Sequence, residues 1–135
     1  MALINRFKYS IAIILVIVYL SLILNPGDYD VQTSRSLIEG ASHVVMYCAF
    51  ALILWFEYMP LYGAYALRHS VRRFKTWMVC FLLPFLFGFL MELSQKYLTT
   101  YRGFEKADIF YNLLGCVVAA ALAIILIAFL RRRAR

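Results

Sequence analysis

Four long stretches of mostly apolar residues divide the chain, and short polar or charged segments separate them. The apolar stretches cover residues 9–24, 40–57, 76–98 and 109–130. A helix needs about 20 residues to cross the hydrocarbon core of a bilayer. The pattern therefore predicts an all-α membrane protein. We expect a four-transmembrane-helix bundle that forms a single domain over residues 1–135.

The composition favours the same fold class. Hydrophobic residues make up 64% of the chain and charged residues 16%, whereas a soluble domain has about 45–50% apolar and about 25% charged residues. These values argue against a disordered protein and against an ordinary soluble enzyme. The net charge is +7, but most basic residues flank the apolar stretches. That placement is typical of membrane topology rather than of nucleic-acid binding, so no nucleic-acid partner is expected.

The distribution of basic residues predicts the orientation of the bundle. Lys and Arg number two before the first stretch, then one, four and three in the successive loops, and four after the last stretch, with Lys96 at the end of the third stretch counted in the loop that follows it. Cytoplasmic loops carry the excess of Lys and Arg. Both termini and the second loop are therefore predicted to be cytoplasmic (N-in/C-in), and the first and third loops to face outward.

Residues 64–77 have the pattern of a cytoplasmic amphipathic helix. Leu67, Val71 and Phe74 recur on one face, and basic residues occupy the other. Such a helix lies in the interface of an anionic leaflet. Further along, Pro84 deprives the Cys80 carbonyl of its helical partner, which predicts a bend in the third stretch.

Polar residues inside or beside the stretches are predicted to gather at one depth on the outward side. They share helix faces through spacings of three or four residues, and they are His43, Tyr47, Glu92, Gln95, Arg102, Asp108 and Asn112. A charged group at the centre of a membrane helix costs about 2.5–3.5 kcal/mol on insertion scales. Each such group therefore needs a partner or water, and their convergence indicates a site.

Each of these residues also has a structural interpretation. In this interpretation, Glu92 is protonated or hydrogen-bonded to a neighbouring helix, and His43 is a core residue whose ring nitrogens have hydrogen-bond partners. Gln95 and Asn112 are hydrogen-bonding glue between helices. Asp108 is the N-cap of the fourth helix, and Arg102 is an interfacial anchor. The three cysteines, Cys48, Cys80 and Cys116, lack metal-binding spacing and are predicted to be small core residues.

Taken together, the motifs resemble the VanZ-like family of small bacterial membrane proteins. The resemblance rests on His43-x-x-x-Tyr47, Glu92-x-x-Gln95, Arg102 and Asp108-x-x-x-Asn112-x-x-Gly115, and it covers about residues 36–120. It implies a multi-pass protein of the bacterial cytoplasmic membrane, linked to the cell envelope and to glycopeptide (teicoplanin) resistance, but no particular reaction. Family members often carry an Asp-Lys pair before the histidine, where this chain has Glu39-Gly40.

Three classes of function remain open from the sequence. In the leading one, the outward site binds an anionic envelope lipid or a lipid-linked cell-wall precursor. Arg102 grips the phosphate or carboxylate, and Tyr47, Gln95 and Asn112 orient the head group. The second is a membrane enzyme that modifies a phosphate-containing lipid. The third is a structural or assembly role with the polar residues as glue.

The enzyme hypothesis assigns catalytic roles to three residues. His43 acts as general base, and Glu92 or Asp108 orients its ring. Ser42 and Ser94 have no nucleophile context. No cofactor is predicted; a divalent metal held by the same three side chains is a minor alternative, because they come from three separate stretches with no local ligand spacing.

Overall fold

Every secondary-structure element in the described part of the chain is a helix. The computed structural model describes residues 5–23, 32–66, 70–99 and 105–133. The helices are α2 (Lys8–Val18), the π-helical η1 (Tyr19–Ile23), α3 (Gln32–Ala66), α4 (Ser70–Trp77), the π-helical η2 (Met78–Leu82), α5 (Leu83–Leu98) and α6 (Lys106–Arg133). The predicted all-α class is confirmed.

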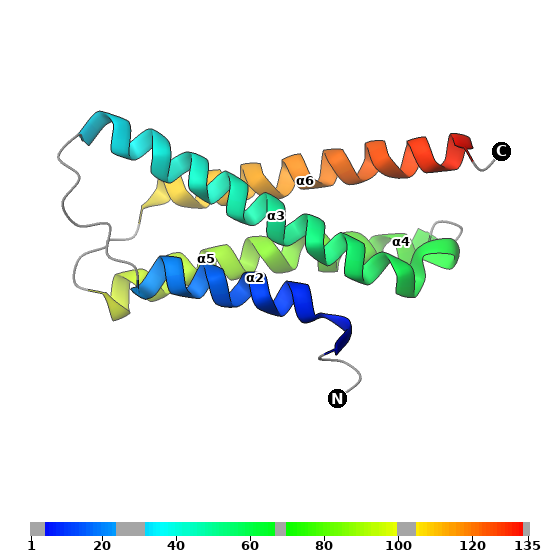
Figure 1. Ribbon diagram of the computed structural model, residues 1–135, viewed down its shortest axis with the longest axis horizontal. Helices are drawn as coiled ribbons and strands as arrows, with labels where there is room; N and C mark the ends of the chain where they lie inside the picture. The colour runs from blue at the N-terminus through cyan, green and yellow to red at the C-terminus, as the bar shows by residue number, and fades with distance from the viewer. Residues whose placement is uncertain (1–4, 24–31, 67–69, 100–104, 134–135) are drawn as a thin grey trace.

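The helices form an elongated bundle in which α2, α3, the continuous segment from α4 to α5, and α6 run in alternating directions (Figure 1). We call the end where α5 ends and α3 and α6 begin the site end, and the opposite end the terminal end. α2 and α5 run toward the site end, and α3 and α6 run away from it. The described chain therefore starts and finishes at the terminal end.

Three helical segments are long and apolar enough to cross a membrane. They are Ile38–Tyr58, Phe74–Leu98 and Lys106–Phe129, which agree closely with the predicted stretches 40–57, 76–98 and 109–130. These segments support a multi-pass membrane protein. The remaining stretch, predicted at 9–24, forms the shorter apolar helix Lys8–Ile23. At about 1.5 Å per residue, its length is about 24 Å.

The closest backbone contact in the core lies between α3 and α6 at Gly115. A Cβ atom built there would lie 2.6 Å from the Val44 carbonyl oxygen and 3.0 Å from the Cys48 backbone nitrogen. Small buried residues continue this side of α6, namely Cys116, Ala119, Ala120 and Ala123. Small residues allow membrane helices to approach closely. Cys80 and Cys116 are buried, as predicted, whereas Cys48 is only partly buried; all three cysteines are free.

Glu57 joins α3 to the start of α2. Its Oε1 accepts a hydrogen bond from the Tyr9 backbone N–H at 2.8 Å, and its Oε2 accepts one from that of Ser10 at 3.0 Å. N–H groups in the first turn have no partner within their own helix, and a carboxylate there also interacts favourably with the helix dipole. Glu57 therefore caps α2 from another helix.

The segment before Pro84 differs in part from the sequence prediction. The π-helical η2 ends at Leu82, and α5 starts with Pro84 in its first turn; the bend at Pro84 stays a prediction. The predicted amphipathic helix over 64–77 is wrong in its bounds. Residues 64–66 belong to α3, residues 67–69 lie outside the described residues, and α4 starts at Ser70 and continues into η2 and α5.

Replacing Gly115 with alanine should destabilise the bundle. The added methyl group would meet backbone atoms of α3, which cannot move aside as the end of a side chain can. Overpacking costs about 1–3 kcal/mol and exceeds the gain in helix propensity of about 1 kcal/mol. We expect a lower thermal unfolding midpoint for Gly115→Ala in detergent. Ala121→Val, on an exposed position of α6, should leave the midpoint unchanged; equal midpoints in both variants would contradict the close contact.

Removing the Glu57 carboxylate should loosen α2. Loss of a helix cap costs about 0.5–2 kcal/mol, so Glu57→Ala should lower the free energy of unfolding by an amount in that range. Hydrogen exchange of the Tyr9 and Ser10 amides should also speed up. Glu105→Ala removes an exposed carboxylate near the start of α6 and serves as the control. If amide exchange were the same in both variants, Glu57 would not act as the cap.

Candidate functional site

Three helices contribute buried polar side chains at the same depth of the bundle. His43 on α3 is 3% exposed, Glu92 on α5 is 1% exposed, and Asn112 on α6 is 0% exposed. Each lies five or six residues from the site end of its apolar segment, which corresponds to about 8–9 Å along the helix axis. The predicted convergence at one depth is therefore present for these three residues.

His43 contacts two polar residues of α6. Its Nδ1 lies 2.9 Å from Asn112 Oδ1, and because a carboxamide oxygen only accepts, Nδ1 is the donor. In the neutral ring, Nε2 then carries the lone pair. Nε2 lies 3.6 Å from Asp108 Oδ2, which is too long for a hydrogen bond. Asp108 and Asn112 are one turn apart on α6, so both face the same imidazole.

Asp108 lies inside the first turn of α6, whose first residue is Lys106. Its backbone N–H donates to the Glu105 carbonyl oxygen at 3.2 Å. The interpretation of Asp108 as the N-cap residue is therefore wrong. A carboxylate in the first turn is still stabilised by the helix dipole.

Glu92 completes a group of three potential ligands. One ligand-type atom each from His43, Glu92 and Asp108 lie within 4.8 Å of one another. Such a set of one imidazole and two carboxyl groups supports either acid–base chemistry or metal binding. The sequence predicted this trio, although its members come from α3, α5 and α6.

Gly88 on α5 makes room for the trio's neighbours. A Cβ atom there would lie 2.9 Å from both Asn112 Nδ2 and Tyr47 Cε1. Tyr47 is buried and stacks on His43, with 6.4 Å between ring centroids. Asn112 Nδ2 is buried and has no hydrogen-bond partner among the described residues. Tyr47 and Asn112 therefore belong to the site as predicted, with α5 packed close above them.

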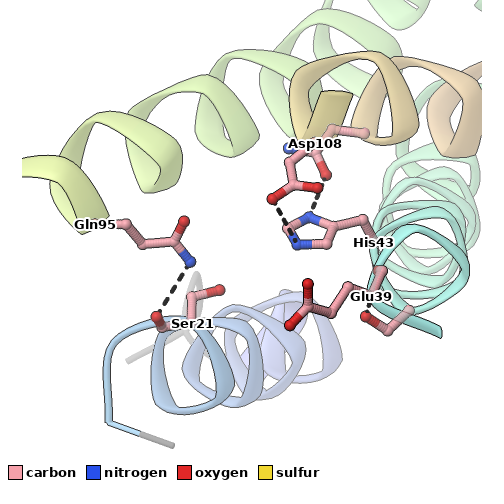
Figure 2. A network of polar contacts seen from close by, with 7 residues as sticks. Ser21, Glu39, His43, Gln95 and Asp108 are labelled. Atoms are coloured by element: carbon pink, nitrogen blue, oxygen red, sulfur yellow. Dashed lines mark hydrogen bonds and ion pairs between the residues drawn. The ribbon is translucent and has the colours of Figure 1, made fainter. Parts of the chain in front are cut away.

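Gln95 is hydrogen-bonded to another helix, whereas the binding hypothesis has its side chain orient the head group of a lipid. Its Nε2 donates to the Ser21 carbonyl oxygen of η1 at 3.1 Å (Figure 2). The structure thus places Gln95 as a link between α5 and the end of α2, which matches its structural interpretation. Arg102, the predicted phosphate-binding residue, lies outside the described residues.

Glu39 is an acidic neighbour that the binding and enzyme hypotheses did not use. It lies one turn before His43 on α3, and its side chain points toward the His43 ring in Figure 2. The i, i+4 spacing was the signal that could have found it. The adjoining Gly40 packs closely against α6, because a Cβ atom there would lie 2.7 Å from the Tyr111 ring. A lysine at this position would displace that ring.

Ser42 and Ser94 both bind carbonyl groups of their own helices. Ser42 Oγ donates to the Glu39 carbonyl oxygen at 2.7 Å, and Ser94 Oγ donates to the Leu90 carbonyl oxygen at 2.8 Å. Each hydroxyl group is thus held by a contact within its own helix.

An apolar groove lies at a distance from the trio, between α3 and α6 toward the terminal end. Its volume is about 430 Å³, and its lining includes Leu52, Trp55, Phe56, Leu126 and Phe129. The lining has no ionisable side chain. The groove therefore offers a surface for hydrocarbon, while acid–base chemistry is confined to the site end.

Comparisons with known proteins and protein families found no match to this chain. No protein-family model matches the chain, and no curated protein or solved structure matches it either. The resemblance to the VanZ-like family therefore stays a prediction from the residues quoted above.

The contact with Asn112 should fix the tautomer of the His43 ring. In chelator-treated protein at a pH where the ring is neutral, we expect ¹⁵N spectra to show a protonated Nδ1 and an unprotonated Nε2. Asn112→Leu removes the acceptor, so the two tautomers should become mixed. Leu114→Ile, on an exposed position of the same helix, should leave the spectrum unchanged. A predominantly Nε2-protonated ring in the wild type would contradict the assignment.

Proposed function

We propose that this protein is a four-span bacterial membrane protein whose outward-facing polar site binds an anionic envelope lipid or a lipid-linked cell-wall precursor. The observation that carries the proposal is the burial of His43, Glu92 and Asn112 at one end of a largely apolar bundle. Ionisable groups at this depth are costly, and groups that cost stability typically mark a site.

The proposal adds a fourth membrane span and an orientation to the three spans that the helix lengths support. Three segments are long enough to span, and the shorter Lys8–Ile23 helix is the proposed fourth. Its start is capped by Glu57, so the first-turn amides need no water. With both ends of the described chain at the terminal end (Figure 1), the alternating Lys and Arg counts put that end in the cytoplasm. The site end then faces outward.

The lipid assignment follows from what surrounds the site. Large apolar side chains cover the outside of the helices, among them Leu90, Phe110 and Val117, so a ligand reaches the polar group most easily from the bilayer. Asn112 Nδ2 offers a buried donor, and Arg102 supplies the positive charge. Altered exposure of such a lipid is the proposed link to glycopeptide (teicoplanin) resistance.

One observation favours the enzyme as a second candidate. The Asn112 contact leaves the His43 Nε2 lone pair on the side of Asp108 and Glu92. A neutral imidazole with a fixed tautomer is suited to act as a general base. The enzyme hypothesis expects the cellular lipid composition to change on expression of the wild type and to revert with Glu92→Gln. The binding hypothesis expects the same composition in both.

Binding of an anionic lipid should depend on Arg102. We would measure retention of phosphatidylglycerol by native mass spectrometry after gentle detergent extraction. Loss of one charge-assisted hydrogen bond costs about 1.5–3 kcal/mol, so Arg102→Ala should weaken retention by about tenfold or more. Arg132→Ala changes an exposed arginine at the terminal end and should retain lipid like the wild type. Equal retention by all three proteins would refute the proposed role of Arg102.

A further inference from the structure

We propose that His43, Glu92 and Asp108 bind one divalent transition-metal ion of the Zn²⁺ class between α3, α5 and α6. One donor atom from each residue lies within 4.8 Å of the other two. Among the described residues, this is the single group of three or more His, Cys, Asp and Glu side chains with such spacing. The inference goes beyond lipid binding and does not depend on it.

The donor distances fit an ion after small side-chain rotations. Zn²⁺ bonds to His nitrogen and carboxylate oxygen at about 2.0–2.2 Å, so two ligands of a tetrahedral ion lie about 3.4 Å apart. His43 Nε2 and Asp108 Oδ2 are already 3.6 Å apart. This separation is too long for a direct hydrogen bond and close to that of two ligands of one ion. The Glu92 donor atom lies within 4.8 Å of both, so a side-chain rotation of Glu92 would complete the set.

The hydrogen bond between His43 and Asn112 independently supports a metal ion at the other nitrogen of the ring. Asn112 Oδ1 accepts from Nδ1 at 2.9 Å, which leaves Nε2 unprotonated and turned toward the carboxylates. Metal-binding histidines almost always donate their other ring N–H to such an oxygen, because the bond fixes the ring and raises its basicity. Asn112 is fully buried, so no solvent competes for this bond.

Charge balance also favours an ion at this place. A divalent cation between the two carboxyl groups matches the charge that they carry when ionised, and charge is costly at this depth of a bilayer. Glu39 also points toward His43 (Figure 2). The ion would additionally explain how an acidic site can hold a phosphate, because it presents an open position to a ligand oxygen; this consequence alone rests on the proposed function.

The mixed nitrogen and oxygen donors select the class of metal. Mg²⁺ prefers oxygen ligands and keeps several waters, whereas imidazole suits Zn²⁺ and its neighbours. Three protein ligands with a fourth position open are typical of functional rather than structural zinc sites. Cysteine takes no part in this set, which distinguishes it from a structural thiolate site.

The test is a metal titration of chelator-stripped, lipid-free protein in detergent. We expect the wild type to bind one Zn²⁺ per chain, counted by elemental analysis. Glu92→Gln and Asp108→Asn should each abolish stoichiometric binding, and Asn112→Leu should weaken it about 10- to 100-fold. Glu105→Gln, an exposed carboxylate of the same end, is the matched control and should bind like the wild type. Unchanged binding in the Glu92 and Asp108 variants, or no saturable binding in the wild type, would overturn the proposal.

A second measurement uses the wild type alone, so that misfolded variants cannot obscure the result. Co²⁺ added in place of Zn²⁺ should give visible absorption typical of nitrogen and oxygen ligands, and the ¹⁵N signal of His43 Nε2 should shift while that of Nδ1 stays protonated. A thiolate-to-cobalt absorption band would place the ion on a cysteine and refute the site. Because the sample contains no lipid, failure here is distinct from failure of the proposed lipid binding.

Discussion

The site depends on the close contact between α3 and α6. Asp108, Asn112 and Gly115 recur at i, i+4 and i+7, so they form one stripe along α6. At the end of this stripe that is nearer the terminal end, Gly115 brings the α6 backbone against Val44 and Cys48 of α3. This contact holds the two polar residues, Asp108 and Asn112, opposite His43. Gly88 allows a similar close approach of α5, because a residue without a side chain lets that helix approach Asn112 and Tyr47. Two glycines thus set the distances among the polar groups.

The sequence was sufficient for those parts of the fold that periodicity and length determine. Helix spans, and the common depth of His43, Glu92 and Asn112, follow from counting residues at a known rise. Partners between distant segments were not accessible in this way. Nothing local to Glu57 indicates that it binds the Tyr9 amide, and nothing local to Gln95 selects the Ser21 carbonyl oxygen. Those pairings depend on how the helices are rotated and staggered, which a single sequence does not encode locally.

The departure from the VanZ-like pattern is understandable in steric terms. Where family members often carry a lysine, Gly40 here leaves space for the Tyr111 ring of α6. The ring and a long basic side chain cannot occupy the same volume, so α3 and α6 pack together at the cost of a cation beside the site. The described part of the site is consequently acidic, with Glu92 and Asp108 facing His43. Our two proposals each bring a positive charge to this acidic group, one through Arg102 and the other through a metal ion.

Glu57 also has a consequence for the order in which the chain enters the membrane. The ribosome makes α2 first, but the carboxylate that satisfies the Tyr9 and Ser10 amides lies 48 and 47 residues later in the chain. Until most of α3 has left the exit tunnel, α2 has neither this acceptor nor the neighbour that buries Ile17 in the core. An α2 released alone into the bilayer would therefore lack contacts that define its position, and these contacts form only once later helices are present.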